Sequence, residues 1–205
     1  MNSLIMQWSS SQMYEGRLVA HSSVSNRVLG DLLPADESRG EDDADNDVNS
    51  QPLIYIDTAG SLMYEAVDQE IGKNESKYNV GEVDLVIQMI KELISVNLQE
   101  KEIGVITPYS AQVSEIRKQL KHLEIGQGPG KKIEVSTVDG FQGREKEVII
   151  ISMVRSNAQN QIGFLSNEKR MNVAVTRAKR LCCLIGDSGT VSSNSFLASL
   201  CAYFR

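Results

Sequence analysis

The segment STVDGFQGREKEVIIIS, residues 136–152, joins a turn of four chemically different side chains to an apolar run. Within seven residues the turn supplies two carboxylates, an amide and a guanidinium, from Asp139, Gln142, Arg144 and Glu145. A turn that only reverses the chain needs Gly, Pro, Asn, Asp or Ser. The extra functional groups indicate either a bound ligand or a solvated turn.

A second polar group lies in RMNVAVTRAKR, residues 170–180. We expect a helix that carries Arg170, Asn172 and Arg177 on one side while its apolar residues face elsewhere. A helix with several arginines is, in isolation, most often a solvated face. A third polar segment, TPYSAQ, begins at Thr107, where an apolar run ends. Together, in this order, the three segments form a pattern that is too specific to result from composition alone.

The glycine-rich segment GQGPGKK, residues 126–132, is a weak candidate for a phosphate-binding loop. Its spacing fails GxxxxGK[ST], and it precedes a strand instead of following one, so we interpret it as a flexible loop. The rest of the sequence offers neither a phosphate loop nor an acidic strand end for Mg²⁺, so we expect no autonomous nucleotide hydrolysis. A dinucleotide-binding enzyme has little support, since no GxGxxG follows a first strand.

The cysteines and histidines give little support for a metal site. Cys182 and Cys183 are adjacent and alternate across an expected strand, so they cannot bridge each other. Cys201, His21 and His122 are scattered, and there is no CxxC pair. We expect buried free thiols in a reducing compartment and no metal.

Length and charge bound the organisation of the chain. Its 205 residues, 41% of them hydrophobic, suffice for one domain with an appendage. Residues 1–100 carry 18 acidic and 6 basic side chains, whereas residues 101–205 carry 9 acidic and 15 basic, so the second half could face phosphates. Residues 35–51 hold seven acids and few apolar side chains, and we expect a disordered acidic loop there. We find no apolar run of membrane-spanning length and no signal-peptide pattern.

The elements that must position these polar groups alternate along the chain. Five apolar segments are expected to be strands: Pro52–Thr58, Ile103–Thr107, Ile133–Val138, Glu147–Val154 and Arg180–Asp187. Helices are expected near Leu4–Gly16, from an Asn79/Glu82 capping box onward, over Ser110–Leu123, over Ser166–Lys179 with Ser166 as N-cap, and over Ser193–Phe204. Residues 59–78 show no clear period.

This alternation predicts an α/β fold, a mainly parallel sheet with helices on both faces. In such sheets, ligands gather beyond the carboxyl ends of the strands. Polar loops follow the strands that end near Thr107, Val138 and Val154. We therefore expect these loops, including the whole Asp139–Glu145 turn, to share one edge as a site.

Four segments resemble the second motor domain of the Upf1-like superfamily 1 helicases, most closely the immunoglobulin mu-binding protein 2 type: ITPYSAQ, VSTVDGFQGREKEVIIISMVRSN, IGFLSNEKRMNVAVTRAKR and IGDSGTVSSNSFL. The resemblance covers nearly the whole chain apart from the acidic loop. It implies a RecA-like fold, that of P-loop NTPases without a P-loop of its own. Residues 1–34 resemble the junction after the family's Gln-Tyr-Arg-Met element, and residues 52–205 the motor domain. The first motor domain, with the phosphate loop and the Mg²⁺ ligands, is then expected outside this sequence.

The resemblance assigns a nucleotide side. Arg177 matches the arginine that reaches the γ-phosphate of ATP, and such arginine fingers are worth about 10³–10⁵ in rate. Glu145 matches an acid that faces the ribose or the nucleotide, Gly143 lets the backbone approach closely, and Gln142 couples the turn to the nucleotide. Phe141 is expected to be a core residue.

The resemblance also assigns a nucleic-acid side. Thr107, Pro108 and Tyr109 match one motif that lies there, and Thr137 and Asp139 match the start of another. Tyr109 can stack on a base or pack in its loop, and both alternatives stay open. Asn172 is assigned to the same side. Arg155 and Asn157 are candidates to link the two sides, whereas Arg144, Lys146, Lys179 and Arg180 are given no role.

The resemblance thus implies the C-terminal motor domain of an ATP-dependent DNA/RNA helicase. It would use ATP with Mg²⁺, bind single-stranded DNA or RNA, work against a first RecA-like domain, and lie in the nucleus or cytoplasm. Joined to that first domain it would be an ATP hydrolase, whereas the chain alone would be inactive. The alternative is a truncated, non-catalytic fragment that acts only as a nucleic-acid or protein binding module.

Overall fold

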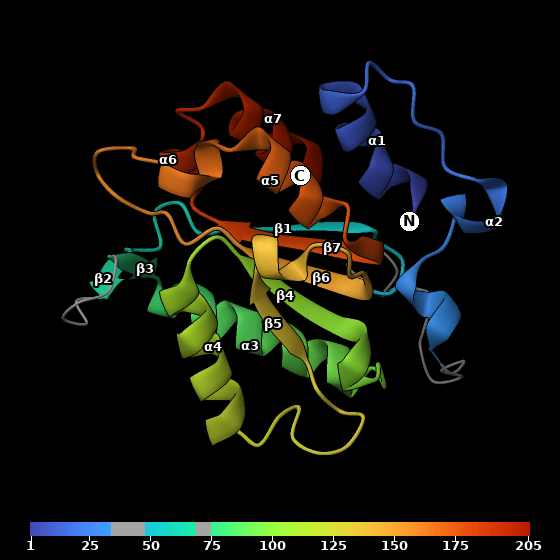
Figure 1. Ribbon diagram of the computed structural model, residues 1–205, viewed down its shortest axis with the longest axis horizontal. Coiled ribbons are helices and arrows are strands. Elements are labelled where there is room, and N and C mark those ends of the chain that lie inside the picture. The colour runs from blue at the N-terminus through green and yellow to red at the C-terminus, as the bar shows by residue number, and fades with distance from the viewer. Residues whose placement is uncertain (34–47, 69–74) are drawn as a thin grey trace.

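The centre of the molecule is a five-stranded sheet, seen nearly edge-on in Figure 1. The computed structural model describes residues 1–33, 48–68 and 75–205, so most of the expected acidic loop at 35–51 lies outside the described residues. The strand order is β1-β7-β6-β4-β5, and every neighbouring pair is parallel. The strands are β1 (Leu53–Asp57), β4 (Ile103–Thr107), β5 (Glu134–Thr137), β6 (Lys146–Ser152) and β7 (Ala178–Gly186). The predicted parallel α/β sheet is confirmed.

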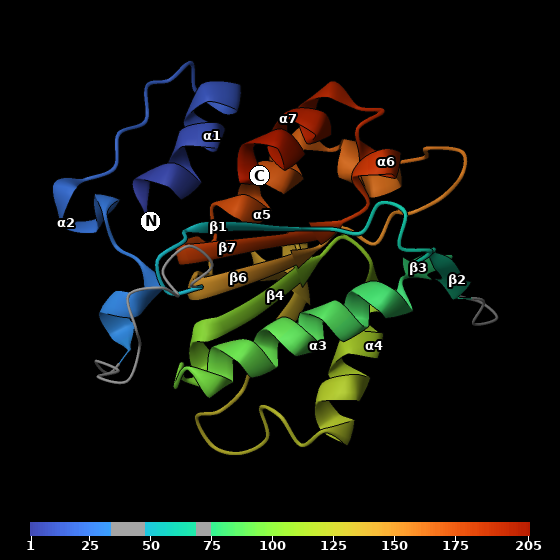
Figure 2. The ribbon, with the colours of Figure 1, turned by 180° about the vertical axis from the view of Figure 1, so that it is seen from behind.

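Helices cover both faces of this sheet (Figures 1 and 2). One face carries α1 (Ser3–Met13), α5 (Glu168–Val175), α6 (Ser188–Val191) and α7 (Ser195–Phe204). The other face carries α3 (Val80–Ser95) and α4 (Ser110–His122). The short helix α2 (Ser22–Ser25) and the 3-10 helix η1 (Leu29–Leu32) lie near the amino terminus, and further single 3-10 turns are η3 (Glu100–Glu102), η4 (Asp139–Phe141) and η5 (Gly163–Ser166). Among the described residues, no helix is long and apolar enough to span a bilayer.

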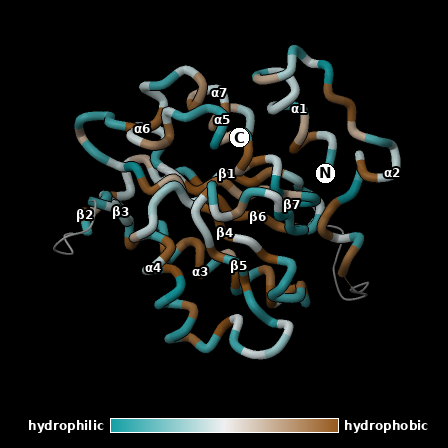
Figure 3. Tube along the Cα trace, viewed as in Figure 1, coloured by the Kyte–Doolittle hydropathy of each residue, from teal (hydrophilic) through white to brown (hydrophobic). Residues whose placement is uncertain are grey.

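The continuous apolar strands of the sequence follow from this double coverage, because a strand buried on both faces needs apolar residues at every position. In β6, Ile149 and Ile151 pack on the α1, α5 and α7 side, whereas Val148 and Ile150 pack on the α3 and α4 side. Figure 3 shows the hydrophobic residues of the central strands inside the two helical layers. Phe141 is fully buried, as predicted.

The parallel register brings the carboxyl ends of the strands to one edge of the sheet. Thr107 pairs with Thr137, and Ser152 lies beside Ile185. The expectation that the whole Asp139–Glu145 turn shares this edge is wrong. The chain leaves the carboxyl edge after Thr137 and returns to the opposite edge, where Lys146 pairs with Ala178 at the beginning of β6. The turn therefore crosses from one edge to the other.

Three local expectations are also corrected. Residues 59–78 contain a two-stranded antiparallel hairpin of β2 (Ala66–Asp68) and β3 (Ser76–Tyr78). The N-cap of α5 is Asn167, whose side chain accepts from the Arg170 N–H, because Ser166 already ends η5. Asn79 caps α3 by accepting from the Glu82 N–H, but the Glu82 carboxylate points into the core instead of closing a capping box.

Candidate functional site

At the amino edge of the sheet, Arg177 lies against the turn that precedes β6. Its Nη1 donates to the Arg144 carbonyl oxygen (3.4 Å), and its own carbonyl accepts from the Lys146 N–H (3.0 Å). Its Nε donates to the Val173 carbonyl oxygen (3.1 Å), which holds the guanidinium at the end of α5. The two segments that the resemblance assigned to the nucleotide side therefore meet in the structure.

The turn itself faces solvent. Gln142, Gly143 and Glu145 are exposed, and a Cβ on Gly143 would meet nothing within 4 Å. Gly143 has a φ of +80°, a left-handed conformation that favours glycine. The Glu145 carboxylate lies 4.0 Å from the Lys179 ammonium. An open backbone, an acid and a guanidinium are thus placed together on one exposed edge.

At the carboxyl edge lies a second group of the predicted residues, around a small hollow lined by Pro108, Thr137, Val138, Asp139, Phe164, Arg170 and Met171. Arg170 bonds both carboxylate oxygens of Asp139, at 3.1 and 2.8 Å, and so ties α5 to η4. Both side chains are substantially exposed. Arg170, which lines this hollow, lies seven residues before Arg177, about 10 Å away at the usual helical rise per residue. The site residues thus divide between two edges.

Tyr109 and Thr107 lie at the carboxyl edge but are buried. Tyr109 is 4% exposed, and its hydroxyl accepts from Arg155 Nη1 (3.3 Å) and from the Phe164 N–H (3.4 Å). The structure therefore favours the packed alternative for Tyr109. Thr107 is fully buried, and its Oγ1 has no hydrogen-bond partner among the described residues.

Phe164 is the aromatic residue at this edge that sequence reasoning missed. Its side chain is 55% exposed, and its ring packs on that of Tyr109 with centroids 5.4 Å apart. An exposed ring supported from beneath is the arrangement that stacks on a nucleobase. The sequence signal that could have found it is the segment GFLS, which places a large apolar residue in a short turn between polar segments.

Arg155 and Asn157 meet at the carboxylate of Glu65, just before β2. Glu65 Oε2 accepts from Arg155 Nε (2.8 Å), from the Ser156 N–H (3.0 Å) and from Asn157 Nδ2 (3.0 Å), while Oε1 pairs with Lys77 (3.0 Å). Burial alone would raise the pKa of Glu65, but these donors outweigh it and hold the pKa below its usual value. The hairpin therefore anchors the loop after β6.

Two residues of the arginine-rich helix region differ from the sequence expectation. Asn172 is 7% exposed and bonds Ser9 Oγ and Tyr14 Oη, which places it between α1 and α5 instead of on the Arg170 side. Arg180, to which the sequence assigns no role, is buried and pairs with Glu147 and Asp31, both at 2.8 Å.

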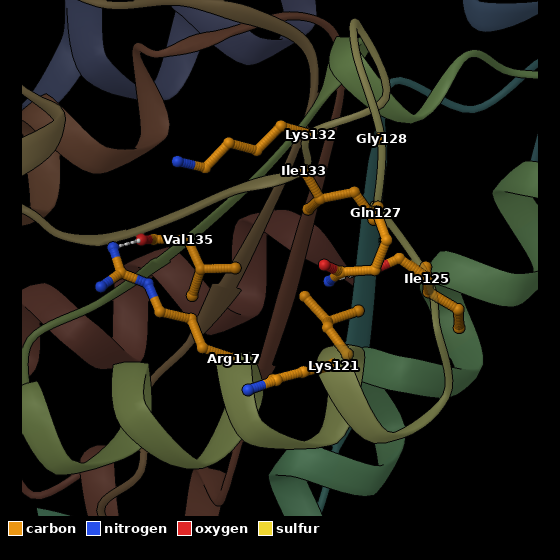
Figure 4. Close-up of a pocket in the computed structure, with 10 residues that line it drawn as sticks. Arg117, Lys121, Ile125, Gln127, Gly128, Lys132, Ile133 and Val135 are labelled. Carbon is orange, nitrogen blue, oxygen red and sulfur yellow. Dashed lines mark hydrogen bonds between the residues drawn. The ribbon is translucent and has the colours of Figure 1, made fainter.

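A pocket with a volume of about 490 Å³ lies elsewhere, between α4 and the glycine-rich loop (Figure 4). Arg117, Lys121 and Lys132 line it, and Arg117 donates to the Val135 carbonyl oxygen (2.6 Å). It includes none of the predicted site residues. The glycine-rich segment forms a loop before β5, as predicted.

The three cysteines are free and buried, as expected. Burial raises the pKa of Cys183 to about 12, and it also raises the pKa values of Cys182 and Cys201, so all three are poor nucleophiles. Over the described ranges, no group of three His, Cys, Asp or Glu side chains could hold a metal ion.

Comparison with known proteins identifies relatives of the chain. A family model described as an AAA domain matches residues 1–189. The DNA polymerase alpha-associated DNA helicase A of Saccharomyces cerevisiae is 47% identical over 187 residues, covering 91% of this chain and 26% of that protein. The DNA-binding protein SMUBP-2 of Rattus norvegicus is 42% identical over 206 residues, covering 100% of this chain and 19% of that protein.

An uncharacterised ATP-dependent helicase of Methanocaldococcus jannaschii is 36% identical, covering 95% of this chain and 26% of that protein. The chain thus spans between about a fifth and a quarter of the length of these curated relatives. What each relative does as a whole protein includes segments that this chain does not contain.

Proposed function

Because this chain belongs to the Upf1-like superfamily 1 helicases, we propose that it acts as the C-terminal motor domain of an ATP-dependent DNA/RNA helicase. In this role the amino edge of the sheet faces ATP, and the carboxyl edge contributes to a single-strand binding surface. A first RecA-like domain supplies the phosphate loop and the Mg²⁺ ligands.

The observation that carries this proposal is the meeting of Arg177 with the Gly143–Glu145 turn, through the Arg144 carbonyl at 3.4 Å. A guanidinium held by its own helix can stabilise negative charge on a transferring phosphoryl group, with little reorganisation during the reaction. The exposed Gly143 backbone leaves room for a nucleotide to approach, and Glu145 would accept a hydrogen bond from ribose hydroxyls. These residues fit one half of a nucleotide site.

The strand surface is supported by a different set of groups. Pro108, Thr137 and the exposed Phe164 ring surround the hollow at the carboxyl edge, and Arg170 adds a cation there. Apolar and aromatic surfaces stack on bases, whereas hydroxyls, amides and cations contact phosphates. Because the Arg177 side chain bonds Val173, Arg144 and Thr176 and none of these groups, hydrolysis and strand binding can be altered separately.

The alternative function is a non-catalytic binding module, which would need the carboxyl edge alone. One experiment separates the two functions: the 205-residue chain and a fusion of this chain to the first motor domain of a Upf1-like relative are assayed for ATP hydrolysis, with and without single-stranded oligonucleotide. We expect no turnover from the chain alone and strand-stimulated turnover from the fusion, because the phosphate loop and the arginine finger must face each other. Strand binding by a fusion that hydrolyses no ATP would favour the binding module.

A further inference from the structure

Val154 adopts a backbone conformation that a valine normally avoids. Its φ is +71°, in the left-handed region, and its side chain is fully buried after the end of β6. For a β-branched residue this conformation is a genuine outlier, and it persists only where the surroundings impose it. The next residue, Arg155, begins the loop that reaches the candidate strand-binding edge.

The first turn of α3 holds both backbone polar groups of Val154. The Glu82 carboxylate accepts from the Val154 N–H through Oε2 (2.9 Å), and Asn79 Nδ2 donates to the Val154 carbonyl oxygen (3.3 Å). Glu82 Oε2 also accepts from Ser152 Oγ (2.6 Å). Two residues of one helical turn thus fix the peptide groups on both sides of the strained residue.

This arrangement is unusual because Glu82 is completely buried. Its Oε1 has no hydrogen-bond partner among the described residues, so no cation neutralises the carboxylate there. A buried acid without a cationic partner is costly, and replacing buried charges by apolar side chains of similar volume is often neutral or stabilising. The contact that an apolar side chain could not make is the one to the Val154 N–H.

The same network reaches the beginning of α4. Gln112 accepts from the Asn79 N–H through Oε1 (2.8 Å) and donates to Ser152 Oγ through Nε2 (2.9 Å). Gln112 lies three residues after Tyr109, whose hydroxyl accepts from Arg155 Nη1. The left-handed turn at Val154 sends Arg155 toward Tyr109, and the Tyr109 ring supports the exposed Phe164.

We propose that Glu82 is a positioning residue for strand binding, which it supports by holding Val154 in the left-handed conformation that aims Arg155 at Tyr109. The inference rests on the proposed function of the carboxyl edge, since Phe164 and its neighbours are the groups that would contact the strand. Glu82 itself touches neither nucleotide nor strand.

The test uses the full 205-residue chain and replaces the carboxylate while keeping its volume. Glu82→Met loses the acceptor, whereas Glu82→Gln keeps one. Two readouts are taken: the NMR signal of the Arg155 Nε–H group, without nucleic acid, and the affinity for a dye-labelled single-stranded DNA oligonucleotide by fluorescence anisotropy. We expect Glu82→Met to shift the Arg155 signal and weaken affinity by about tenfold, and Glu82→Gln to restore both to near the wild-type values.

A second set of variants makes the Glu82 contact unnecessary by changing Val154 itself. Glycine accepts a φ of +71° at little cost, so Val154→Gly should restore the Arg155 signal and the affinity of Glu82→Met, whereas Val154→Ala, which removes nearly the same side chain but still disfavours that φ, should not. Equal behaviour of the Gly and Ala double variants would overturn the inference. So would an unchanged Arg155 signal in Glu82→Met, or a Glu82→Met chain that stays unfolded with Val154→Gly.

The two readouts separate this inference from the proposed function. If the wild-type chain bound no strand while the Arg155 signal followed the pattern above, the strand-binding proposal would fail and the effect of Glu82 on Arg155 would stand. If strand affinity were unaffected by Glu82→Met although the Arg155 signal moved, Glu82 would not be a positioning residue for strand binding.

Discussion

At the scale of single residues, the contact between Arg155 and Tyr109 depends on Gly163, the residue before Phe164. Gly163 has a φ of +53°, and a Cβ there would overlap Arg155 Nη1 and lie 2.6 Å from the Tyr109 hydroxyl oxygen. A side chain at this position would therefore separate Arg155 from Tyr109. Gly163 combines a left-handed conformation with a close approach, and either requirement alone favours glycine.

We predict that Gly163→Ala weakens single-strand binding by more than its effect on stability explains. Left-handed backbone should cost alanine about 1–2 kcal/mol of unfolding free energy, and the displaced Arg155 and Tyr109 should move the Phe164 ring. The matched control is Gly16→Ala, since Gly16 has a φ of +74° and a Cβ there would meet nothing within 4 Å. Both variants should lower the melting temperature, but only Gly163→Ala should lower strand affinity. Equal affinities of the two variants would contradict the packing argument.

At the scale of elements, the first turn of α3 carries a buried carboxyl group, that of Glu82, whose pKa is shifted. Burial raises the pKa of Glu82 to about 7, because hydrogen bonds from Ser152 and the Val154 N–H only partly offset the lost hydration, and the nearby Asp187 carboxylate adds to the rise. Below pH 4.5 this carboxyl is protonated in both the folded and the unfolded chain. As the pH rises toward 7, the unfolded chain ionises first, so the folded state loses relative stability.

We therefore predict that the difference in unfolding free energy between the wild type and Glu82→Gln depends on pH. Between about pH 4 and 8 the wild type should lose about 3 kcal/mol relative to Glu82→Gln, the value that a rise in pKa of this size implies. Urea unfolding of both proteins across this range measures the difference. Parallel stability curves would show that the Glu82 pKa is not raised by burial.

The elements also show how far the sequence alone reaches. The five strands and the helices α1, α3, α4, α5 and α7 follow from apolar runs and helical periods, because a strand buried on both faces is apolar throughout and a helix buried on one face has an apolar stripe. The β2–β3 hairpin leaves none, since its three-residue strands carry Asp68 and Lys77 and show no sustained alternation. The contact of Glu82 with Ser152 joins residues 70 positions apart, so no local pattern predicts it. The spacing of Asn79 and Glu82 instead indicates a capping box, which gives Glu82 a different role.

The candidate site was predictable to a similar degree. Motif resemblance brought Arg177 and the Gly143–Glu145 turn together, and the structure places them in contact through Arg144. The division of the turn between two edges could have been predicted, because a connection between two parallel strands must run from the carboxyl edge of one to the amino edge of the next. The exposed Phe164 and the buried Tyr109 depend on how two distant loops pack, which no local pattern encodes.

At the scale of the whole molecule, the sheet separates two tasks. Its amino edge holds the proposed arginine finger, and its carboxyl edge holds the proposed strand contacts, with a fully buried core between them. The strands and their packed helices connect the two edges, and in the proposed function a cleft against a first motor domain would close over the amino edge. This arrangement predicts that the two tasks fail independently when single residues are changed.

The most direct measurement of this claim is the turnover number of Arg177→Ala in the fusion with a first motor domain, at saturating ATP and single-stranded DNA. We predict a loss of about 10³-fold or more in kcat, an oligonucleotide affinity close to the wild-type value, and no rescue by Arg177→Lys, because an ammonium cannot reproduce the planar guanidinium. The control is Arg17→Ala, an exposed arginine far along the sequence that pairs only with Glu15 among the described residues, and it should keep full turnover. Near-normal kcat in Arg177→Ala would contradict the assignment of the arginine finger and of the amino edge to the nucleotide.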